Sequence, residues 1–157
     1  MGCGKSTTGK KIAKKLSYDF IDLDHYIEAQ EKMTISEIFE KYGEATFRQM
    51  ETDTLKTLMN YNGNAILSLG GGTPCFNDNM QIIKEKSKSF YLDFPAKVLF
   101  DRLQQGKHKR PLIASLNDEE LMQFINNKIE ERRSFYEQAD HQMTSIHQIE
   151  DQIINLV

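Results

Sequence analysis

The first residues of the chain have the composition of a phosphate-binding loop. The segment Gly2–Thr7, GCGKST, matches the second half of the G-x-x-x-x-G-K-[ST] pattern, in which Gly4 precedes Lys5. In such loops, backbone N–H groups and the positive end of the following helix attract phosphate oxygens. Lys5 adds a point charge for the β- and γ-phosphates, and the Ser6 hydroxyl can ligate Mg²⁺. The loop therefore predicts a nucleotide site; the alternative is a glycine-rich turn before a basic helix.

Two carboxylates, Asp22 and Asp24, flank Leu23 at the end of an expected strand over Asp19–Leu23. Because side chains alternate along a strand, both carboxylates are expected on one side, at the edge where open α/β sheets bind ligands. One carboxylate can hold Mg²⁺ or its water beside Ser6, and the other can accept a proton from a substrate hydroxyl. The alternative is a strand end capped by turn-favouring aspartates.

Arg48 and Glu51 lie three residues apart on an expected helix and therefore share a face. Such a pair is usually a solvent-exposed ion pair that contributes little. A guanidinium can also bind a carboxylate through two parallel hydrogen bonds, and Glu51 would then orient Arg48 from behind. The pair is thus a candidate site for a substrate carboxylate.

Two more segments contain residue types that occur in ligand sites. Gly70, Gly71 and Gly72 follow an apolar strand, so a ligand can approach the backbone there and accept hydrogen bonds from its N–H groups. A tight turn is the alternative for these glycines. Farther along the chain, Arg132 and Tyr136 share one face of an expected helix.

A polar segment, Gln105–Asn117, separates two expected helices and carries Lys107, Lys109 and Arg110. A mobile basic loop can close over phosphates, exclude water and bring a cation to the charge that develops on a transferred phosphoryl group. The alternative is an ordinary solvent-exposed loop, which is the usual location of a charge run. The pattern favours a lid at about residues 105–117.

The elements that must position these residues alternate between short apolar runs and helical periodicity. No repeat or linker divides the chain, so residues 1–157 are expected to form one α/β domain with a parallel sheet covered on both faces. A stripe of large apolar residues, Phe47, Met50, Leu55, Leu58 and Met59, is expected to pack in the core. Expected strands are Asp19–Leu23, Ala65–Leu69, Ser89–Asp93 and, weakly, Gln142–Ile146, and expected helices are Lys5–Leu16, Tyr26–Tyr42, Glu44–Tyr61, Asn77–Lys86, Ala96–Gln104, Asp118–Gln138 and a last one from Gln148.

Composition excludes several classes of protein. A formal net charge of −3 shows no basic excess, so no nucleic-acid partner is expected. Cys3 and Cys75 are too few for a disulfide framework and lack the spacing of a zinc site. The sequence contains no apolar run of membrane-spanning length and no signal peptide at its start, so no membrane partner is expected. We expect a cytoplasmic, monomeric protein.

Taken in order, these segments resemble the shikimate kinase family. The resemblance implies a three-layer α/β/α P-loop fold with a five-stranded parallel sheet, like that of the nucleoside monophosphate kinases. It also implies that ATP and Mg²⁺ are used to phosphorylate the 3-hydroxyl of shikimate, on the pathway to aromatic amino acids. The matching segments are the GCGKST loop, the DLD of Asp22–Asp24, the FRxxE of Phe47–Glu51, the glycines Gly70–Gly72, the RPL of Arg110–Leu112 and the RxxxYxxAD of Arg132–Asp140.

The resemblance also implies a role for each matching residue. The two arginines of the shikimate site would bind the carboxylate, Asp24 the hydroxyls, and Arg110 would be the lid arginine near the transferring phosphate. Expected nucleotide contacts are Gly2, Cys3, Gly4, Lys5, Ser6, Thr7, Arg102 beside adenine, and Arg110, with Ser6 and Asp22 at the metal. Expected shikimate contacts are Asp24, Arg48, Gly70, Gly71, Gly72 and Arg132, and the catalytic set is Lys5, Asp24 and Arg110.

The N-terminus departs from the family pattern, which has a strand and a first loop glycine before the position of Met1. That strand lies in the family between those formed here by Ala65–Leu69 and Ser89–Asp93. Two unpaired strand edges are therefore predicted, and the loss can rival the roughly 5–15 kcal/mol stability of a domain. We expect Met1 to be an internal methionine of a longer protein, and the chain to fold or bind ATP poorly. Another small-molecule P-loop kinase, such as a gluconate kinase, and a non-catalytic binding domain are the alternatives.

Overall fold

The structure, a computed structural model, describes residues 2–110 and 112–157. The strands in these ranges form two separate parallel pairs. β1 (Asp19–Asp22) pairs with β2 (Ala65–Ser68), and β3 (Phe90–Leu92) pairs with β4 (His141–Met143). No ladder joins β2 to β3 within the described part of the chain. The sequence predicts unpaired strand edges at this place in the strand order, and that prediction is confirmed.

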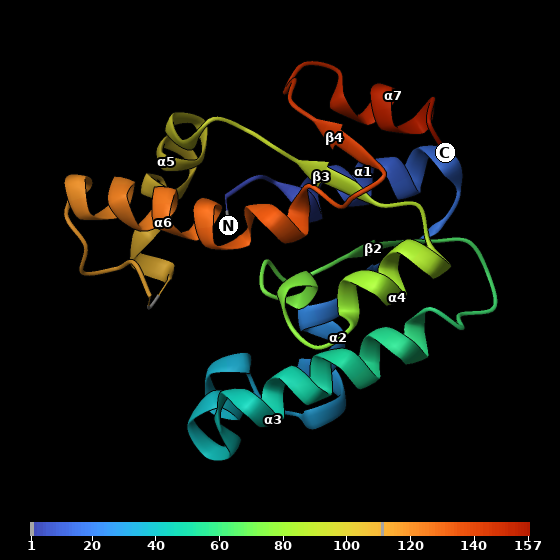
Figure 1. Cartoon of the computed structure of the whole chain (residues 1–157), viewed down its shortest axis with the longest axis horizontal. Coiled ribbons are helices and arrows are strands. Elements are labelled where there is room, and N and C mark those ends of the chain that lie inside the picture. Colours follow the sequence, from blue (N-terminus) through green and yellow to red (C-terminus); the bar gives the residue numbers. More distant parts are fainter. Residues whose placement is uncertain (1, 111) are drawn as a thin grey trace.

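Helices lie on both sides of the strands, which is the α/β arrangement that the sequence predicts. In Figure 1, α1 lies behind the strands and α4 lies in front of β2. None of the helices in the described residues is long and apolar enough to span a membrane. Two helices have their predicted bounds, α1 (Lys5–Leu16) and α5 (Ala96–Gln104); the others are α2 (Leu23–Glu31), α3 (Ile35–Leu58), α4 (Asn79–Lys86), α6 (Asp118–Tyr136) and α7 (Ile149–Ile154).

The predicted helix over Tyr26–Tyr42 is wrong, because the chain breaks earlier. Lys32 adopts a left-handed conformation with φ 54° and ends α2. Thr34 then starts α3 with a capping box, in which its side chain accepts from the Glu37 N–H and the Glu37 carboxylate accepts from the Thr34 N–H. The predicted break at Gly43 is present as a kink, with φ 80° and ψ 169°, inside the longer helix α3.

Strand β1 also ends earlier than predicted. Asp22 is the last strand residue, and Leu23 is already the first residue of α2. Leu23 is fully buried as a residue of the helix. Its burial therefore does not depend on the alternation of side chains along a strand. Asp24 consequently lies in the first turn of α2, and the expectation that both carboxylates project from one strand is wrong.

Within the described residues, the core consists of three apolar clusters rather than one. The largest lies among α1, α5, α6 and α7, the second between α2 and α3, and the third between α3 and α4. The predicted stripe of α3 is confirmed as core but is divided between clusters, with Phe47 and Leu58 in the second and Leu55 in the third. Helix α3 therefore anchors both α2 and α4, which fixes the position of Arg48.

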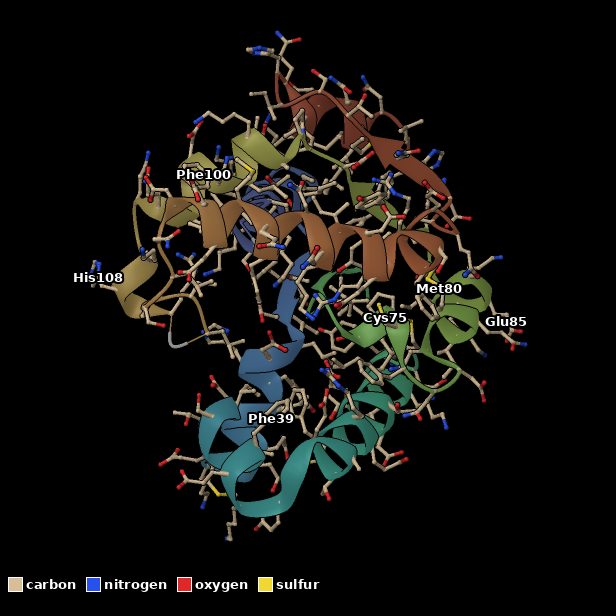
Figure 2. The ribbon with its side chains drawn as sticks, turned by 60° about the vertical axis from the view of Figure 1, so that its left-hand side comes forward. Phe39, Cys75, Met80, Glu85, Phe100 and His108 are labelled. Atoms are coloured by element: carbon tan, nitrogen blue, oxygen red, sulfur yellow. The ribbon has the colours of Figure 1, made fainter. Side chains whose placement is uncertain are left out.

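A cavity of about 620 Å³ lies between the two strand pairs. Its walls are mainly apolar and include Ile12 of α1, Ile66 of β2 and Leu92 of β3. Gly71 and Arg132 also line this cavity, next to the polar region where the predicted site residues lie. In Figure 2, the labelled Met80 of α4 is one of the residues that line this cavity, whereas the labelled His108 of the lid is not.

Candidate active site

The start of α1 and the ends of β1 and β2 bring four polar side chains together. Ser6 donates a 2.7 Å hydrogen bond to the Asp22 carboxylate. The Lys5 ammonium lies 3.2 Å from the Ser68 hydroxyl and 3.7 Å from the same carboxylate. Gly4, with φ 86°, is the left-handed residue from which α1 begins, and no side chain caps the free N–H groups of the first helical turn. The arrangement can hold a phosphate and a divalent cation side by side.

The electrostatics of Asp22 suit a metal ligand. Burial alone would raise its pKa, but the hydrogen bond from Ser6 and the positive charge of Lys5 outweigh burial and lower the pKa to about 2. His25 lies 3.4 Å from the other carboxylate oxygen and acts in the same direction. Asp22 is therefore ionised across the physiological pH range.

Asp24 has the opposite shift. Its burial in the first turn of α2 raises its pKa, the charge of Lys5 lowers it, and the neighbouring Asp22 and Glu51 carboxylates raise it further. The carboxylate lies against Gly70, where an added Cβ would be 2.9 Å from Asp24 Oδ1. Asp24 thus joins the predicted glycine segment to the phosphate-binding end of the sheet.

Each of the three glycines is in contact with a different charged side chain. A Cβ on Gly71 would lie 2.8 Å from Arg132 Nη1, and a Cβ on Gly72 would lie 2.8 Å from Arg48 Nη1. A Cβ at either position would displace the arginine beside it, so glycine lets both guanidinium groups reach the backbone. The Gly71–Gly72 dipeptide is consequently flanked by one guanidinium from α6 and another from α3.

Arg48 is held in a fixed orientation. Its Nη1 is 2.5 Å from Glu51 Oε2, and the Glu51 side chain is only 1% exposed. Glu44, which is exposed, accepts from the Nε and Nη2 atoms at 3.2 and 3.0 Å. The ring of Phe76 lies 4.1 Å from the centre of the guanidinium and covers one face of it. The predicted role of Glu51 behind Arg48 fits this geometry, whereas the sequence did not indicate Phe76.

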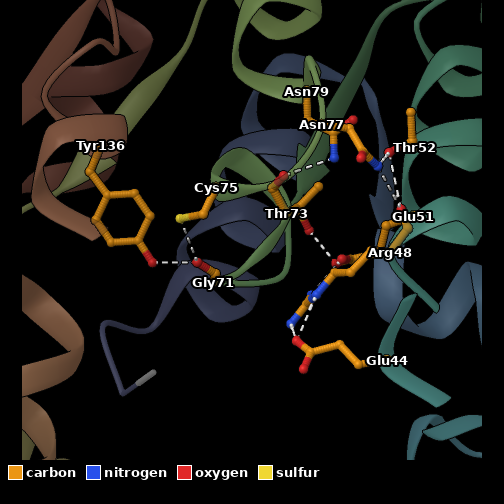
Figure 3. Close-up of polar contacts among 10 residues, drawn as sticks. All are labelled: Glu44, Arg48, Glu51, Thr52, Gly71, Thr73, Cys75, Asn77, Asn79 and Tyr136. Carbon is orange, nitrogen blue, oxygen red and sulfur yellow. Dashed lines mark hydrogen bonds and ion pairs between the residues drawn. The ribbon is translucent and has the colours of Figure 1, made fainter. Parts of the chain in front are cut away.

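The segment after the glycines is tied to α3 by hydrogen bonds that the sequence analysis missed. Thr73 donates to Glu51 Oε1 at 2.5 Å, and the Asn77 amide donates to the Thr52 hydroxyl at 2.7 Å. Asn79 donates to the Thr73 carbonyl at 2.8 Å, and Figure 3 shows all three contacts. Small polar residues directly after a glycine run were the only available signal. The glycine segment and Arg48 therefore form one connected unit.

Two predicted nucleotide contacts lie along the backbone of the phosphate loop. Gly2 has φ 72°, and a Cβ there would lie 2.9 Å from Leu103 Cγ of α5. The Arg102 guanidinium donates to the Cys3 carbonyl at 2.7 Å and lies 5.2 Å from the centre of the Phe94 ring. The placement of Arg102 beside adenine stays a prediction. Thr7 is exposed in the first turn of α1.

The predicted lid connects α5 to α6 at the edge of the molecule (Figure 1). It contains a short 3₁₀ turn at Lys107–Lys109, after which Arg110 donates to the Gly106 carbonyl at 3.3 Å. Ile113 is fully buried, whereas the Leu112 side chain is exposed. Position 111 of the predicted lid lies outside the described residues, and closure of the lid over phosphates stays a prediction.

Comparison with known proteins gives a consistent result. A family model described as shikimate kinase matches residues 1–157. The shikimate kinase of Bacteroides thetaiotaomicron is 43% identical over 141 residues, which cover 90% of this chain and 80% of the relative. That of Flavobacterium johnsoniae is 40% identical over 144 residues, covering 91% of this chain and 84% of the relative.

Solved structures agree with the sequence matches. The crystal structure of shikimate kinase from Bacteroides thetaiotaomicron has a TM-score of 0.91 at 40% identity and covers 99% of this chain and 91% of its own. Shikimate kinase from Acinetobacter baumannii, solved in complex with shikimate, has a TM-score of 0.84 at 30% identity, covering 99% of this chain and 85% of its own. From its sequence and its fold, this chain belongs to the shikimate kinase family.

Proposed function

We propose that this chain transfers the γ-phosphoryl group of ATP to the 3-hydroxyl of shikimate. The observation that carries the proposal is the glycine segment, which brings Asp24, Arg48 and Arg132 together around Gly70–Gly72. Shikimate is a cyclic carboxylate with several hydroxyls, and this set offers cations for the first group and a carboxylate for the second. The phosphate-binding end of α1 lies next to the same set, since the Lys5 ammonium is 3.7 Å from Asp22, two residues before Asp24.

Substrate binding is assigned first to the two arginines. Arg48 and Arg132 flank the Gly71–Gly72 backbone, so a planar carboxylate placed there would meet a guanidinium on each side. Glu51 and Phe76 keep Arg48 oriented before the substrate arrives, which reduces the entropy lost on binding.

Catalysis then depends on position and charge. Asp24 would orient the attacking hydroxyl and accept its proton, and its raised pKa brings it closer to the pH at which it must accept that proton. Lys5 would stabilise charge on the transferred phosphoryl group, as would Arg110 when the lid closes. Phosphoryl transfer requires little covalent chemistry from the protein, so residues that supply position and charge suit the reaction.

A magnesium ion fits the donors present. Within the described residues no group of three or more His, Cys, Asp or Glu side chains gathers at one point. Mg²⁺ bound with ATP needs only one or two protein ligands, because phosphates and water supply the rest. The Ser6 hydroxyl and the ionised Asp22 carboxylate, 2.7 Å apart, would hold it, and the ion would neutralise negative charge on the phosphates. A monomer in the cytoplasm, where free Cys3 and Cys75 remain reduced, completes the proposal.

The test is a coupled assay of ADP release with ATP and Mg²⁺, comparing shikimate, gluconate and no acceptor. Shikimate-dependent turnover is expected, and Asp24→Asn should lower it about 100-fold or more if proton acceptance contributes as in other enzymes. Asp53→Asn is the matched control, because Asp53 is an exposed carboxylate of α3 that, among the described residues, accepts only from Gln49. Turnover of gluconate without turnover of shikimate would refute the proposed function.

A further inference from the structure

The carbonyl group of Gly71 is held by a residue that the proposed function does not use. Tyr136, in the last turn of α6, donates its hydroxyl to this carbonyl at 2.5 Å. The same helix carries Arg132, whose guanidinium lies against Gly71. In Figure 3, Tyr136 lies on one side of Gly71, and Arg48 with its carboxylate partners lies on the other.

Because the peptide bond is planar, the contact with Tyr136 also fixes the direction of the neighbouring Gly72 N–H. The bond between Gly71 and Gly72 is trans, so the Gly71 carbonyl and the Gly72 N–H point in opposite directions. Because the carbonyl is directed at Tyr136, the N–H is directed away from α6, toward the α3 side of the loop. Gly72 is also the glycine in contact with the Arg48 guanidinium. Among the described residues, this N–H has no backbone acceptor.

We propose that Tyr136 is a positioning residue for the substrate carboxylate. By holding the Gly71 carbonyl, it keeps the Gly72 N–H directed at the carboxylate site as a third donor, beside the guanidinium groups of Arg48 and Arg132. This inference rests on the proposed function, since the carboxylate is that of shikimate. Without the hydroxyl, the donor that remains to the Gly71 carbonyl among the described residues is the Cys75 thiol, at 4.0 Å. So weak a contact leaves the Gly71–Gly72 peptide free to rotate, and its carbonyl oxygen would then repel a carboxylate.

The hydroxyl of Tyr136 can be separated from the packing of its ring. The ring lies against that of Tyr91, with centroids 5.0 Å apart, and a phenylalanine would keep this contact. Burial raises the pKa of the Tyr136 hydroxyl, although nearby Arg132 opposes the shift, so the group remains protonated and able to donate at neutral pH. Tyr136→Phe therefore keeps the ring packing and removes only the hydroxyl, with its hydrogen bond to Gly71 and its contact with Arg132.

The experiment measures equilibrium binding of shikimate and of its uncharged methyl ester to the full chain and to Tyr136→Phe. We expect Tyr136→Phe to weaken shikimate binding about 3- to 10-fold, the equivalent of one hydrogen bond, and to leave binding of the ester and of ATP unchanged. Tyr91→Phe is the matched control, because the Tyr91 hydroxyl donates to Asp93 at 2.9 Å and not to the glycine segment. This control should bind both ligands like the unsubstituted chain.

Each other outcome overturns the inference. Equal loss of acid and ester binding would mean that Tyr136 supports the fold without directing a donor. Unchanged shikimate binding in Tyr136→Phe would mean that the Gly72 N–H needs no support from α6. If the unsubstituted chain itself bound no shikimate, the proposed function would fail, and the inference would fail with it.

Discussion

At the scale of single residues, the site depends on backbone positions as much as on charged side chains. Arg48 and Arg132 come from different helices, and each reaches a glycine where no Cβ stands in the way. Thr73 links the buried Glu51 to the glycine segment, so the carboxylate that orients Arg48 also orients the loop. A substitution of Thr73 or of Glu51 should therefore change the positions of both the glycine segment and Arg48.

Replacing Arg48 by lysine tests the carboxylate site. Lysine keeps the charge but loses the planar fork, the side-on contact with Glu44 and the stacking under Phe76. Shikimate affinity should fall about 10- to 100-fold, the equivalent of losing hydrogen bonds to a charged group, while ATP affinity stays nearly unchanged. Isothermal titration calorimetry with each ligand measures both values.

The matched control is Arg133→Lys. Arg133 lies on α6 and forms exposed ion pairs with Glu130 and Glu137, so this change should alter neither affinity. An equal loss of ATP affinity in Arg48→Lys, with shikimate binding intact, would show that Arg48 forms only a structural ion pair.

Some of these residues could be predicted from the sequence and others could not. Arg48 and Glu51 are close in the chain, so helical spacing alone placed them on one face. Tyr136 and Gly71 are 65 positions apart, and Thr73 and Glu51 are 22 positions apart. Periodicity carries no information about such contacts, because tertiary packing decides which elements meet.

At the scale of elements, α3 bends at Gly43, ahead of the segment whose Phe47 and Leu58 pack in the second cluster and whose Leu55 packs in the third. The φ of 80° and ψ of 169° are accessible to glycine but strained for other residues. Gly43→Ala should therefore lower the free energy of unfolding by about 1–3 kcal/mol, although no atom lies within 4 Å of the added Cβ. Urea denaturation measures this change.

Gly63→Ala is the comparison for that experiment. Gly63 is not among the glycines with positive φ, and the nearest obstacle to a Cβ is the flexible side chain of Tyr61. Its effect should be clearly smaller than that of Gly43→Ala. Equal effects would indicate that the conformation of Gly43 carries no strain for alanine.

The β3–β4 pair is tied together at its start by Asp140. Its carboxylate accepts from both the backbone N–H and the hydroxyl of Ser89, at 2.8 and 2.7 Å. These hydrogen bonds lower the pKa of Asp140 below its ordinary value of 3.8. The stabilisation is thus fully present above the unfolded pKa and is lost as the pH falls through the lower folded pKa.

Asp140→Asn should therefore lower the melting temperature at pH 7 by about 2–4 °C, as expected for a domain of this size. The difference from the unsubstituted chain should shrink as the solution is acidified below pH 4, which thermal unfolding at several pH values would measure. Glu119→Gln, at an exposed carboxylate on α6, is the control. A difference that stays constant with pH would exclude the ionised carboxylate as the cause.

Element types were more predictable than element ends. α1 and α5 begin and end as the sequence predicts, because glycine or proline lies at the start of each. The break at Lys32 was missed because a lysine in the left-handed conformation leaves no signature in the sequence. The capping box of Thr34 and Glu37 was a readable signal that the helical periodicity obscured.

At the scale of the whole molecule, nucleotide binding should be visible as added stability. A ligand present at 100 times its dissociation constant raises the free energy of unfolding by about 2.7 kcal/mol, which corresponds to about 5–11 °C in melting temperature. ATP with Mg²⁺ should produce this shift, and Lys5→Met should abolish most of it at the same concentration. Lys10→Met, at an exposed position of α1, should retain the shift. Identical shifts in the two variants would argue against the phosphate loop as the binding site.

The separation of the two strand pairs bears on how cooperatively the molecule melts. The β1–β2 part and the β3–β4 part are connected through α1, which packs against β1, β2 and α7, and through α6 where it meets the turn at Thr73–Cys75. Helix packing of this kind couples two parts less tightly than a continuous hydrogen-bonded sheet would. Single domains of this size usually unfold in one all-or-none step, with equal calorimetric and van't Hoff enthalpies. Here the β1–β2 part and the β3–β4 part can melt one after the other. The calorimetric enthalpy should therefore exceed the van't Hoff enthalpy in differential scanning calorimetry. If the two enthalpies were equal, the packing of α1 and α6 alone would make the molecule a single cooperative unit.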